Sequence, residues 1–191
     1  MNDASLTYTV SSIGFSYEST SGTSLSIGND QTISGIPIGF AFTYWGTDYT
    51  TVGIADNSIV SFTGSSMIFG MNMDLYPSTG YYINYQTIGS APNRKFVVSY
   101  HIAYIQCQTT FADSQIVLYE TPNIIKINVK SHPGCNSRWS IQGIIYQGNP
   151  TYTPGRGNTD WSGTYNDAVE FDPIFTICDT CQPGYQRTTN L

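Results

Sequence analysis

Charged side chains are scarce in this chain. They make up only 10% of its 191 residues, against about 25% in an average soluble domain. Seven Lys and Arg stand against thirteen Asp and Glu, which gives a formal net charge of -6 at pH 7. The basic residues are scattered, apart from the adjacent pair Arg94 and Lys95. Because binding to phosphate backbones needs clustered positive charge, we expect no nucleic acid partner.

Long apolar runs and a leader sequence are also lacking. No stretch reaches the roughly 18 consecutive apolar residues of a membrane-spanning helix, so we expect a protein that does not span a membrane. The first residues, MNDASLTYTVSS, have neither a basic region nor an apolar core and do not form a secretory signal. Either a signal has been removed, or the protein reaches the outside without one, as a virion component does.

The motifs of common enzymes are missing. The sequence contains no GxSxG, no HExxH, no phosphate-binding loop and no dinucleotide fingerprint. His101 alternates with apolar residues and His132 lies in KSHPGC, so we interpret both as structural. Paired acids for glycoside hydrolysis could come only from carboxylates that suit solvated loops equally well: Asp74, Asp160, Asp167, Glu170 and Asp172. We therefore expect no enzymatic activity and no cofactor.

Calcium is the alternative to having no bound group. The stretches ADNS (55–58) and NDAVEFD (166–172) offer oxygen ligands near turns. Neither matches an EF-hand or an RTX repeat. We favour ordinary Asx turns at both places.

The sequence does have a clear period of two. IPIGFAFTYWG places large apolar residues on one face of a strand: Ile36, Ile38, Phe40, Phe42 and Tyr44. KFVVSYHIAYI (95–105) alternates in the same way, and WSIQGIIYQG (139–148) predicts a further strand. Hairpins are predicted over 49–62, turning at 56–58, and over 114–130, turning at 121–123.

These patterns predict an all-β fold. At least seven short strands, and no convincing helical window, indicate an antiparallel β-sandwich that is jelly-roll-like. Residues 63–80 and 147–168 are interpreted as long loops rich in Gly and Tyr, where such scaffolds often hold binding residues. We divide the chain into an N-terminal strand or arm region (1–33), a sandwich domain (34–175) and a Cys-containing C-terminal tail (176–191). The sandwich pattern is expected to end near Asp172 and Pro173, where a C-terminal arm begins.

The four cysteines allow three pairings. Cys107 follows one long strand and Cys135 precedes another, so we prefer a disulfide between them, with two buried free thiols as the alternative. Such a bond would add about 3 to 4 kcal/mol in the chain-entropy model and would indicate an oxidising location. Cys178 and Cys181 form a CxxC, which suits a local or intermolecular disulfide, free thiols, or metal or redox chemistry.

Aromatic residues are the remaining candidates for a site. Six of them could stack on sugar rings or could fill a core or an interface: Trp45, Tyr81, Tyr82, Tyr85, Tyr152 and Trp161. We favour the core or interface interpretation. A carbohydrate-binding surface is the alternative.

Four blocks of sequence carry a family resemblance. In order they are IPIGFAFTYWGTDYTTVGIADNSIVSF, IGSAPNRKFVVSYHIAYIQC, SQIVLYETPNIIKINVKSHPGC and IQGII. Over about residues 34–172 the chain resembles a nidogen-like β-module of Bacteroidetes surface proteins, including adhesins and gliding-motility-associated proteins. Two cysteines flank the central hairpin in that family and match Cys107 and Cys135, so the resemblance supports their pairing.

The resemblance implies an extracellular, non-catalytic, structural or adhesive role. Members of the family usually carry a signal peptide, immunoglobulin-like repeats and a sorting domain, which this sequence does not show. We therefore expect a homo-oligomer or a partner of other structural subunits, self-assembling into a filament or layer at the cell surface. A phage decoration, fibre or spike protein in a virion is the alternative, and a module that binds a surface glycan is a second one.

Overall fold

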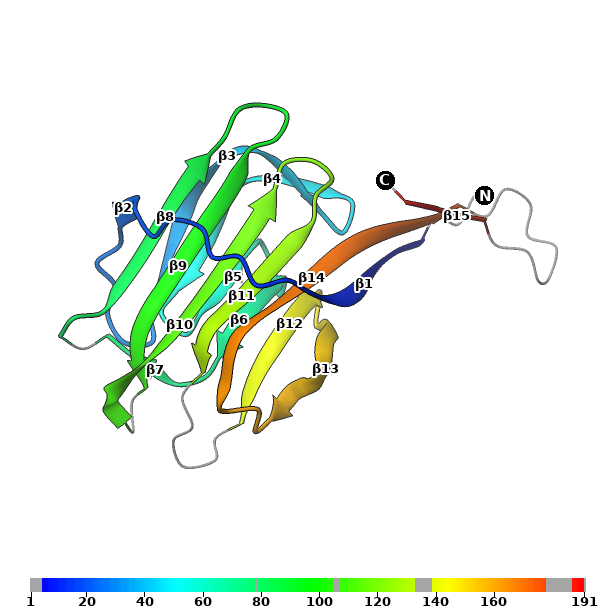
Figure 1. The fold of residues 1–191 in the computed structure, drawn as a ribbon. Coiled ribbons are helices and arrows are strands. Elements are labelled where there is room, and N and C mark those ends of the chain that lie inside the picture. Colours follow the sequence, from blue (N-terminus) through cyan, green and yellow to red (C-terminus); the bar gives the residue numbers. More distant parts are fainter. Residues whose placement is uncertain (1–4, 78, 105–106, 133–138, 178–186, 191) are drawn as a thin grey trace.

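Figure 1 shows a computed structural model of the chain, which describes residues 5–77, 79–104, 107–132, 139–177 and 187–190. In these ranges every regular element is a β-strand, and the strands pair antiparallel in two sheets. The two sheets face each other, which confirms the predicted antiparallel β-sandwich. No helix among the described residues has the length and apolar character needed to cross a membrane.

The larger sheet, sheet A, forms the face seen at the front of Figure 1. Its strands lie in the order β1 (Ser5–Ile13), β14 (Thr164–Ile177), β11 (Ile125–His132), β10 (Cys107–Tyr119), β9 (Lys95–Tyr104), β8 (Tyr82–Ile88) and β2 (Thr23–Ser24). Two further strands lie off this path. They are β15 (Arg187–Asn190), which pairs with β14, and β7 (Leu75–Tyr76), which pairs with β9.

The second sheet, sheet B, lies behind sheet A. Its order is β13 (Asn149–Thr159), β12 (Ser140–Tyr146), β6 (Met67–Asn72), β5 (Ile59–Ser61), β4 (Thr47–Ala55) and β3 (Thr32–Tyr44). The strand β3 is therefore a long edge strand of sheet B, and β1 is an edge strand of sheet A.

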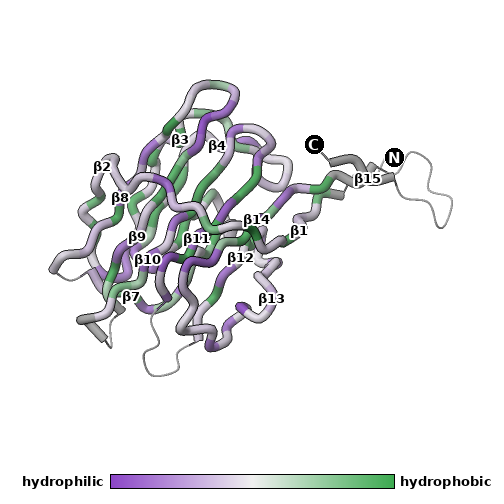
Figure 2. The backbone as a smooth tube through the Cα atoms, viewed as in Figure 1, coloured by the Kyte–Doolittle hydropathy of each residue, from purple (hydrophilic) through white to green (hydrophobic). Residues whose placement is uncertain are grey.

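The core lies between the sheets and follows the predicted alternation. Along β3 every second residue from Ile36 to Tyr44 is buried. The largest fully buried side chains include Tyr44, Tyr100, Phe42 and Phe96, each of which stabilises the fold by about 1.5–3 kcal/mol through burial. Figure 2 shows apolar and polar residues alternating along the strands of sheet A. Both predicted hairpins are confirmed, as β4–β5 and β10–β11.

The prediction of two long loops was wrong. Residues 63–80 contain β6 and β7, and residues 147–168 contain β13 and the start of β14. The strand β13 has the sequence NPTYTPGRGNT, whose Pro and Gly disfavour a strand in isolation. It pairs only with β12, and an edge strand tolerates proline because one side of it needs no partner.

One strand runs through the point where the C-terminal arm was expected to begin, and the predicted domain division stays a prediction. The strand β14 continues without a break through Asp172 and Pro173 to Ile177. Its last part pairs with β1 on one side and with β15 on the other. These three strands extend beyond the sandwich, as Figure 1 shows at the right.

Residues 14–22, which we call the strap, connect β1 to β2. The strap crosses the outer face of sheet A from β14 to β8 (Figure 1). Sheet A is thus covered on both faces, by sheet B on the inside and by the strap on the outside.

Candidate functional site

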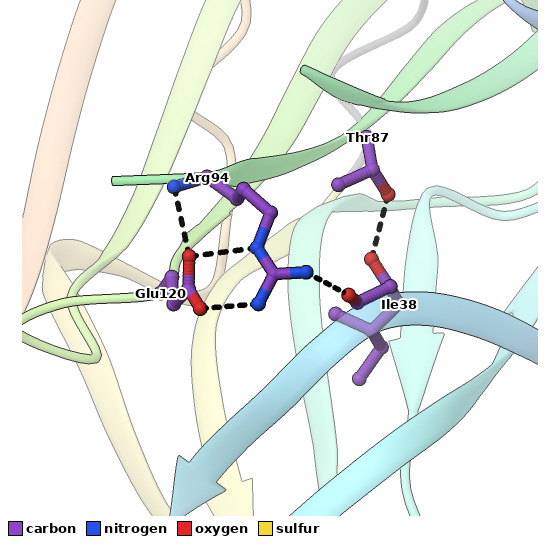
Figure 3. Close-up of polar contacts among 5 residues, drawn as sticks. Ile38, Thr87, Arg94 and Glu120 are labelled. Carbon is purple, nitrogen blue, oxygen red and sulfur yellow. Dashed lines mark hydrogen bonds and ion pairs between the residues drawn. The ribbon is translucent and has the colours of Figure 1, made fainter. Parts of the chain in front are cut away.

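The adjacent basic residues are engaged within the fold. Arg94 donates from Nε to Glu120 Oε2 at 2.8 Å and from Nη2 to Glu120 Oε1. Its Nη1 donates to the carbonyl oxygen of Gly39 on β3. These hydrogen bonds hold the pKa of Glu120 below its ordinary value. Figure 3 shows that Arg94 joins the start of β9 in sheet A to the edge of sheet B, so it is not a free binding residue.

Two more side chains bond to the free edge of β3. Thr87 Oγ1 donates to the carbonyl oxygen of Ile38 at 2.6 Å (Figure 3). The backbone N–H of Thr43 donates to Asn123 Oδ1 at 3.0 Å. Pro37 removes a further donor from the same strand. An edge whose backbone groups are already bonded or missing is a poor template for another strand, so the edge of β3 is blocked.

Lys95 and Gln115 hold the strap at Glu18. Lys95 Nζ lies 2.7 Å from Glu18 Oε1. The fully buried amide of Gln115 accepts from the backbone N–H of Glu18 at 2.8 Å and donates to its carbonyl oxygen at 2.9 Å. The strap is therefore anchored at its middle by one residue of β9 and one of β10.

The rest of the outer face of sheet A is engaged in the same way. Three side chains donate to strap carbonyl oxygens: Lys126 to Ser16 at 3.4 Å, Gln86 to Ser19 at 2.6 Å and Asn84 to Thr20 at 2.8 Å. Lys126 alternates with the core residues Ile125 and Ile127 along β11, yet only 7% of it is exposed. This burial lowers its pKa. The strap turns a polar sheet face into a second buried layer.

The edges of β8 and β13 are protected by other means. Leu25 donates from its backbone N–H to the carbonyl oxygen of Ile83 at 2.8 Å, and β2 pairs beside it, so β8 is partly covered. The strand β13 carries Pro150 and Pro154 and pairs irregularly with β12. Prolines and irregular pairing are common protections of sheet edges.

The edge of β1 has none of these protections. One side of β1 pairs with β14 over all nine residues, from Ser5 with Thr176 to Ile13 with Ala168. On its other side no strand of the described ranges pairs with it. Its sequence, SLTYTVSSI, contains neither proline nor a charged residue. Among the edges formed by β1, β3, β8 and β13, the edge of β1 is thus the open one.

The side chains of β1 alternate between solvent and the core. Thr7, Thr9 and Ser11 are exposed. Tyr8 is buried, with its ring 5.2 Å from the ring of Trp45. The strand is therefore fixed in place by Tyr8 while its hydroxyl-bearing face and outer edge meet solvent. The sequence predicted only a strand or arm region over 1–33, because the alternation of Thr and Ser indicates a strand but not whether its edge is paired.

The six aromatic candidates do not form one surface. Four are partly buried and pack against the core: Trp45, Tyr81, Tyr85 and Trp161. Tyr82 stacks on His101, and Tyr152 is 37% exposed on β13. Two aromatics that were not predicted are more exposed, Trp139 at 66% and Tyr165 at 60%. They stand next to strand ends, where sequence gives no signal of exposure.

Both histidines are packed among aromatic rings. His101 Nδ1 lies 2.7 Å from Asp113 Oδ1, and its ring stacks on that of Phe111 at 4.2 Å. His132 is fully buried and its Nε2 lies 2.9 Å from Ser140 Oγ. Within the described residues His101 lies beside a carboxylate, and the hydroxyl of Ser140 beside His132 is buried, so neither pair presents an exposed nucleophile.

The candidate acids are spread along the chain. Asp74 follows β6 and Asp160 follows β13, while the other three candidates lie on β14. Asp167 accepts from Arg156 Nη1 at 2.6 Å. Glu170 and Asp172 are two residues apart and share a face of the strand; burial, and then the charge of Asp172, raises the pKa of Glu170.

The oxygen ligands proposed for calcium serve turns and strands. Asp56 is buried and its Oδ2 accepts from the backbone N–H of Asp30 at 2.9 Å. Asn57 Oδ1 accepts from the backbone N–H of Leu75 at 2.8 Å. Residues 166–172 form part of β14. Within the described ranges no group of three or more His, Cys, Asp or Glu could hold a metal ion, and calcium stays a hypothesis.

The cysteine predictions lie outside what the structure describes. Cys135, Cys178 and Cys181 fall in 133–138 and 178–186, beyond the described ranges. Cys107 begins β10, and its side chain is outside the described part. The preferred pairing of Cys107 with Cys135 stays a prediction.

A family model described as NIDO related matches residues 7–166. The match begins in β1 and ends in β14, so it includes both sheets. It confirms the nidogen-like resemblance, while the Bacteroidetes setting stays a prediction. No match was found among the curated proteins or among the solved structures.

Proposed function

The chain belongs to the NIDO related family, and from this we propose that it is a non-enzymatic extracellular structural module that self-assembles into a surface filament or layer. The observation that carries the proposal is the contrast between its sheet edges. The edges of β3 and β13 are blocked by side chains or prolines and the edge of β8 is partly covered by neighbouring backbone, whereas the edge of β1 is open.

An open edge supports assembly because it offers a row of backbone donors and acceptors to another strand. A protein that stays monomeric protects such edges, as this one does at β3. The strands β1, β14 and β15 also extend beyond the sandwich (Figure 1).

The non-enzymatic part of the proposal rests on how the polar side chains are used. Arg94, Glu120 and Gln115 bond to backbone or to each other, and Lys95 bonds to the carboxylate of Glu18, so that these residues join the sheets and the strap. These side chains form their hydrogen bonds with other groups of the protein, which is typical of a structural role rather than a catalytic one.

Wild-type protein tests the proposal directly. Light scattering after gel filtration, over a wide concentration range, is expected to show growing assemblies, and negative-stain microscopy is expected to show filaments or layers. Monodisperse monomers at high concentration would contradict self-assembly. Capsid and tail genes beside the coding gene would instead favour the virion alternative, with assembly occurring on a phage particle.

Carbohydrate binding is a second candidate, favoured by Trp139 and Tyr165. Exposed aromatic rings can stack on sugar rings, and these two are the most exposed large hydrophobic side chains among the described residues. A glycan array with wild type and with a Trp139→Ala, Tyr165→Ala double variant tests it. No signal from wild type would remove this candidate, and equal signals for both proteins would remove these two residues as its site.

A further inference from the structure

We propose that β1 pairs with β1 of a second copy, antiparallel, about a twofold axis that passes beside Thr9. This inference rests on the proposed self-assembly and names the strand and the register that carry it. In that register residue numbers of opposed pairs add up to 18, so that Thr9 faces Thr9 of the partner copy. The sheet A of one copy then continues into the sheet A of the other.

The length of β1 selects this register. With the axis at Thr9, all nine residues of Ser5–Ile13 are paired. Moving the axis to Thr7 or to Ser11 leaves only five residues in the pairing. Because each paired residue adds to the backbone ladder, the register centred on Thr9 makes the most hydrogen bonds.

The side-chain pattern selects it as well. Exposed hydroxyls meet exposed hydroxyls, since Thr7 lies opposite Ser11 and Thr9 opposite Thr9. On the other face the buried Tyr8 lies opposite the half-buried Val10. A register shifted by one residue would place exposed Thr side chains opposite the core-facing ones. The central residues of β1, from Thr7 to Ser11, are therefore complementary to themselves.

Charge does not oppose this contact. Each copy carries a net charge of -6, yet β1 itself is uncharged. The nearest acid to the axis is Asp172, which pairs with Thr9 from β14. The two copies of Asp172 are three strand spacings apart, about 14 Å, which exceeds the screening length of about 8 Å at physiological salt. An uncharged strand suits another uncharged strand, and β1 of a second copy is such a strand.

The twofold axis limits what this contact can build. An isologous interface uses the same patch on both copies and therefore closes as a dimer. A filament or layer needs a second contact elsewhere, so the β1 dimer is its building unit.

Disulfide trapping tests the register. In Thr9→Cys the two new thiols lie opposite each other, with Cβ atoms about 4.5–5.5 Å apart. In the matched control Thr7→Cys they are four residues out of register, about 13 Å apart. Under mild oxidation, T9C is expected to give covalent dimers on non-reducing gels, well above the wild-type background from the native cysteines. T7C is expected to match that background.

A charge variant tests the same contact without oxidation. Thr9→Lys places two ammonium groups face to face at the axis and is expected to weaken dimerisation at least tenfold in analytical ultracentrifugation. The control is Ala41→Lys, which is exposed on the blocked edge strand β3 and is expected to dimerise like wild type.

The outcomes separate the two levels of the proposal. If wild type assembles while T9C forms no dimers above background, or while T9K assembles normally, self-assembly stands and the β1 contact is overturned. Equal trapping in T9C and T7C would also overturn the register. If wild type is monomeric at every concentration, both the assembly and the β1 contact are overturned.

Discussion

Arg94 and Glu120 form an ion pair through two parallel side-chain hydrogen bonds, and the same guanidinium reaches the carbonyl oxygen of Gly39 on the opposite sheet. A third bond runs from the backbone N–H of Arg94 to Glu120 Oε2 at 3.0 Å. The planar fork of arginine suits this double role, which the single ammonium of a lysine could not perform. Arg94 thus links the two sheets and also bonds to the backbone at the edge of β3.

Removing the carboxylate of Glu120 should make the stability of the fold less dependent on pH in the acidic range. Because the pKa of Glu120 is lowered by folding from its ordinary 4.5, its stabilisation is present above about pH 4.5 and is lost as pH falls through the lower folded value. Glu120→Gln is expected to melt below wild type near neutral pH. The difference should shrink on acidification, as measured by thermal melts across that range.

Arg94→Lys is the control for that experiment. It keeps the positive charge but loses the fork, so we expect it to melt below wild type while keeping the pH dependence. An Arg94→Lys protein as stable as wild type would show that charge alone holds the two residues together.

Gln115→Ala should loosen the strap. The variant loses two hydrogen bonds to Glu18 and one to Ser99 Oγ from a fully buried amide. We expect a loss of about 1–3 kcal/mol in urea unfolding and faster hydrogen exchange over residues 14–22. The control Glu18→Gln removes only a partly exposed ion pair with Lys95, which should cost less than about 1 kcal/mol. Equal losses in the two variants would contradict the role given to Gln115.

The sequence predicted the sandwich because most strands carry their own signal. The alternation along 36–44 and the turns at 56–58 and 121–123 depend only on neighbouring residues, and all three are present in the structure. The strand β13 carries the opposite local signal, and only its pairing with β12 makes it a strand. Local propensity could not reveal it.

The site was less predictable because its contacts join distant parts of the chain. Glu18 lies 97 residues from Gln115, and Arg94 lies 55 residues from Gly39. A sequence shows Arg94 as one of two adjacent basic residues and shows the strap as a polar stretch without a period. The open edge of β1 follows only from the sheet order, since it is defined by which strands are paired.

Ser114→Ala should destabilise the fold because the buried hydroxyl of Ser58 loses its hydrogen-bond partner. Ser114 Oγ and Ser58 Oγ are 2.8 Å apart and both residues are fully buried, one on sheet A and one in the turn of sheet B. Without its partner, the hydroxyl of Ser58 stays buried and unpaired, which costs about 1–3 kcal/mol. Urea unfolding measures the loss, and Ser34→Ala at an exposed position should change little. A Ser114→Ala protein as stable as its control would contradict the pairing.

Asp56→Asn should stabilise the protein near neutral pH. Burial raises the pKa of Asp56, so ionisation of this carboxyl opposes folding, and the penalty is absent below the unfolded pKa of about 3.9. An Asn at this position still accepts the hydrogen bond from Asp30 through its amide oxygen. We expect a higher melting temperature than wild type near pH 7 and no difference in strong acid. Added calcium tests the alternative interpretation, in which the Asp56 carboxylate is a calcium ligand. An ion bound to this carboxylate would stabilise wild type and not the variant. If added calcium raises the melting temperature of wild type alone, and Asp56→Asn melts lower, the carboxylate is a ligand and the burial account is wrong.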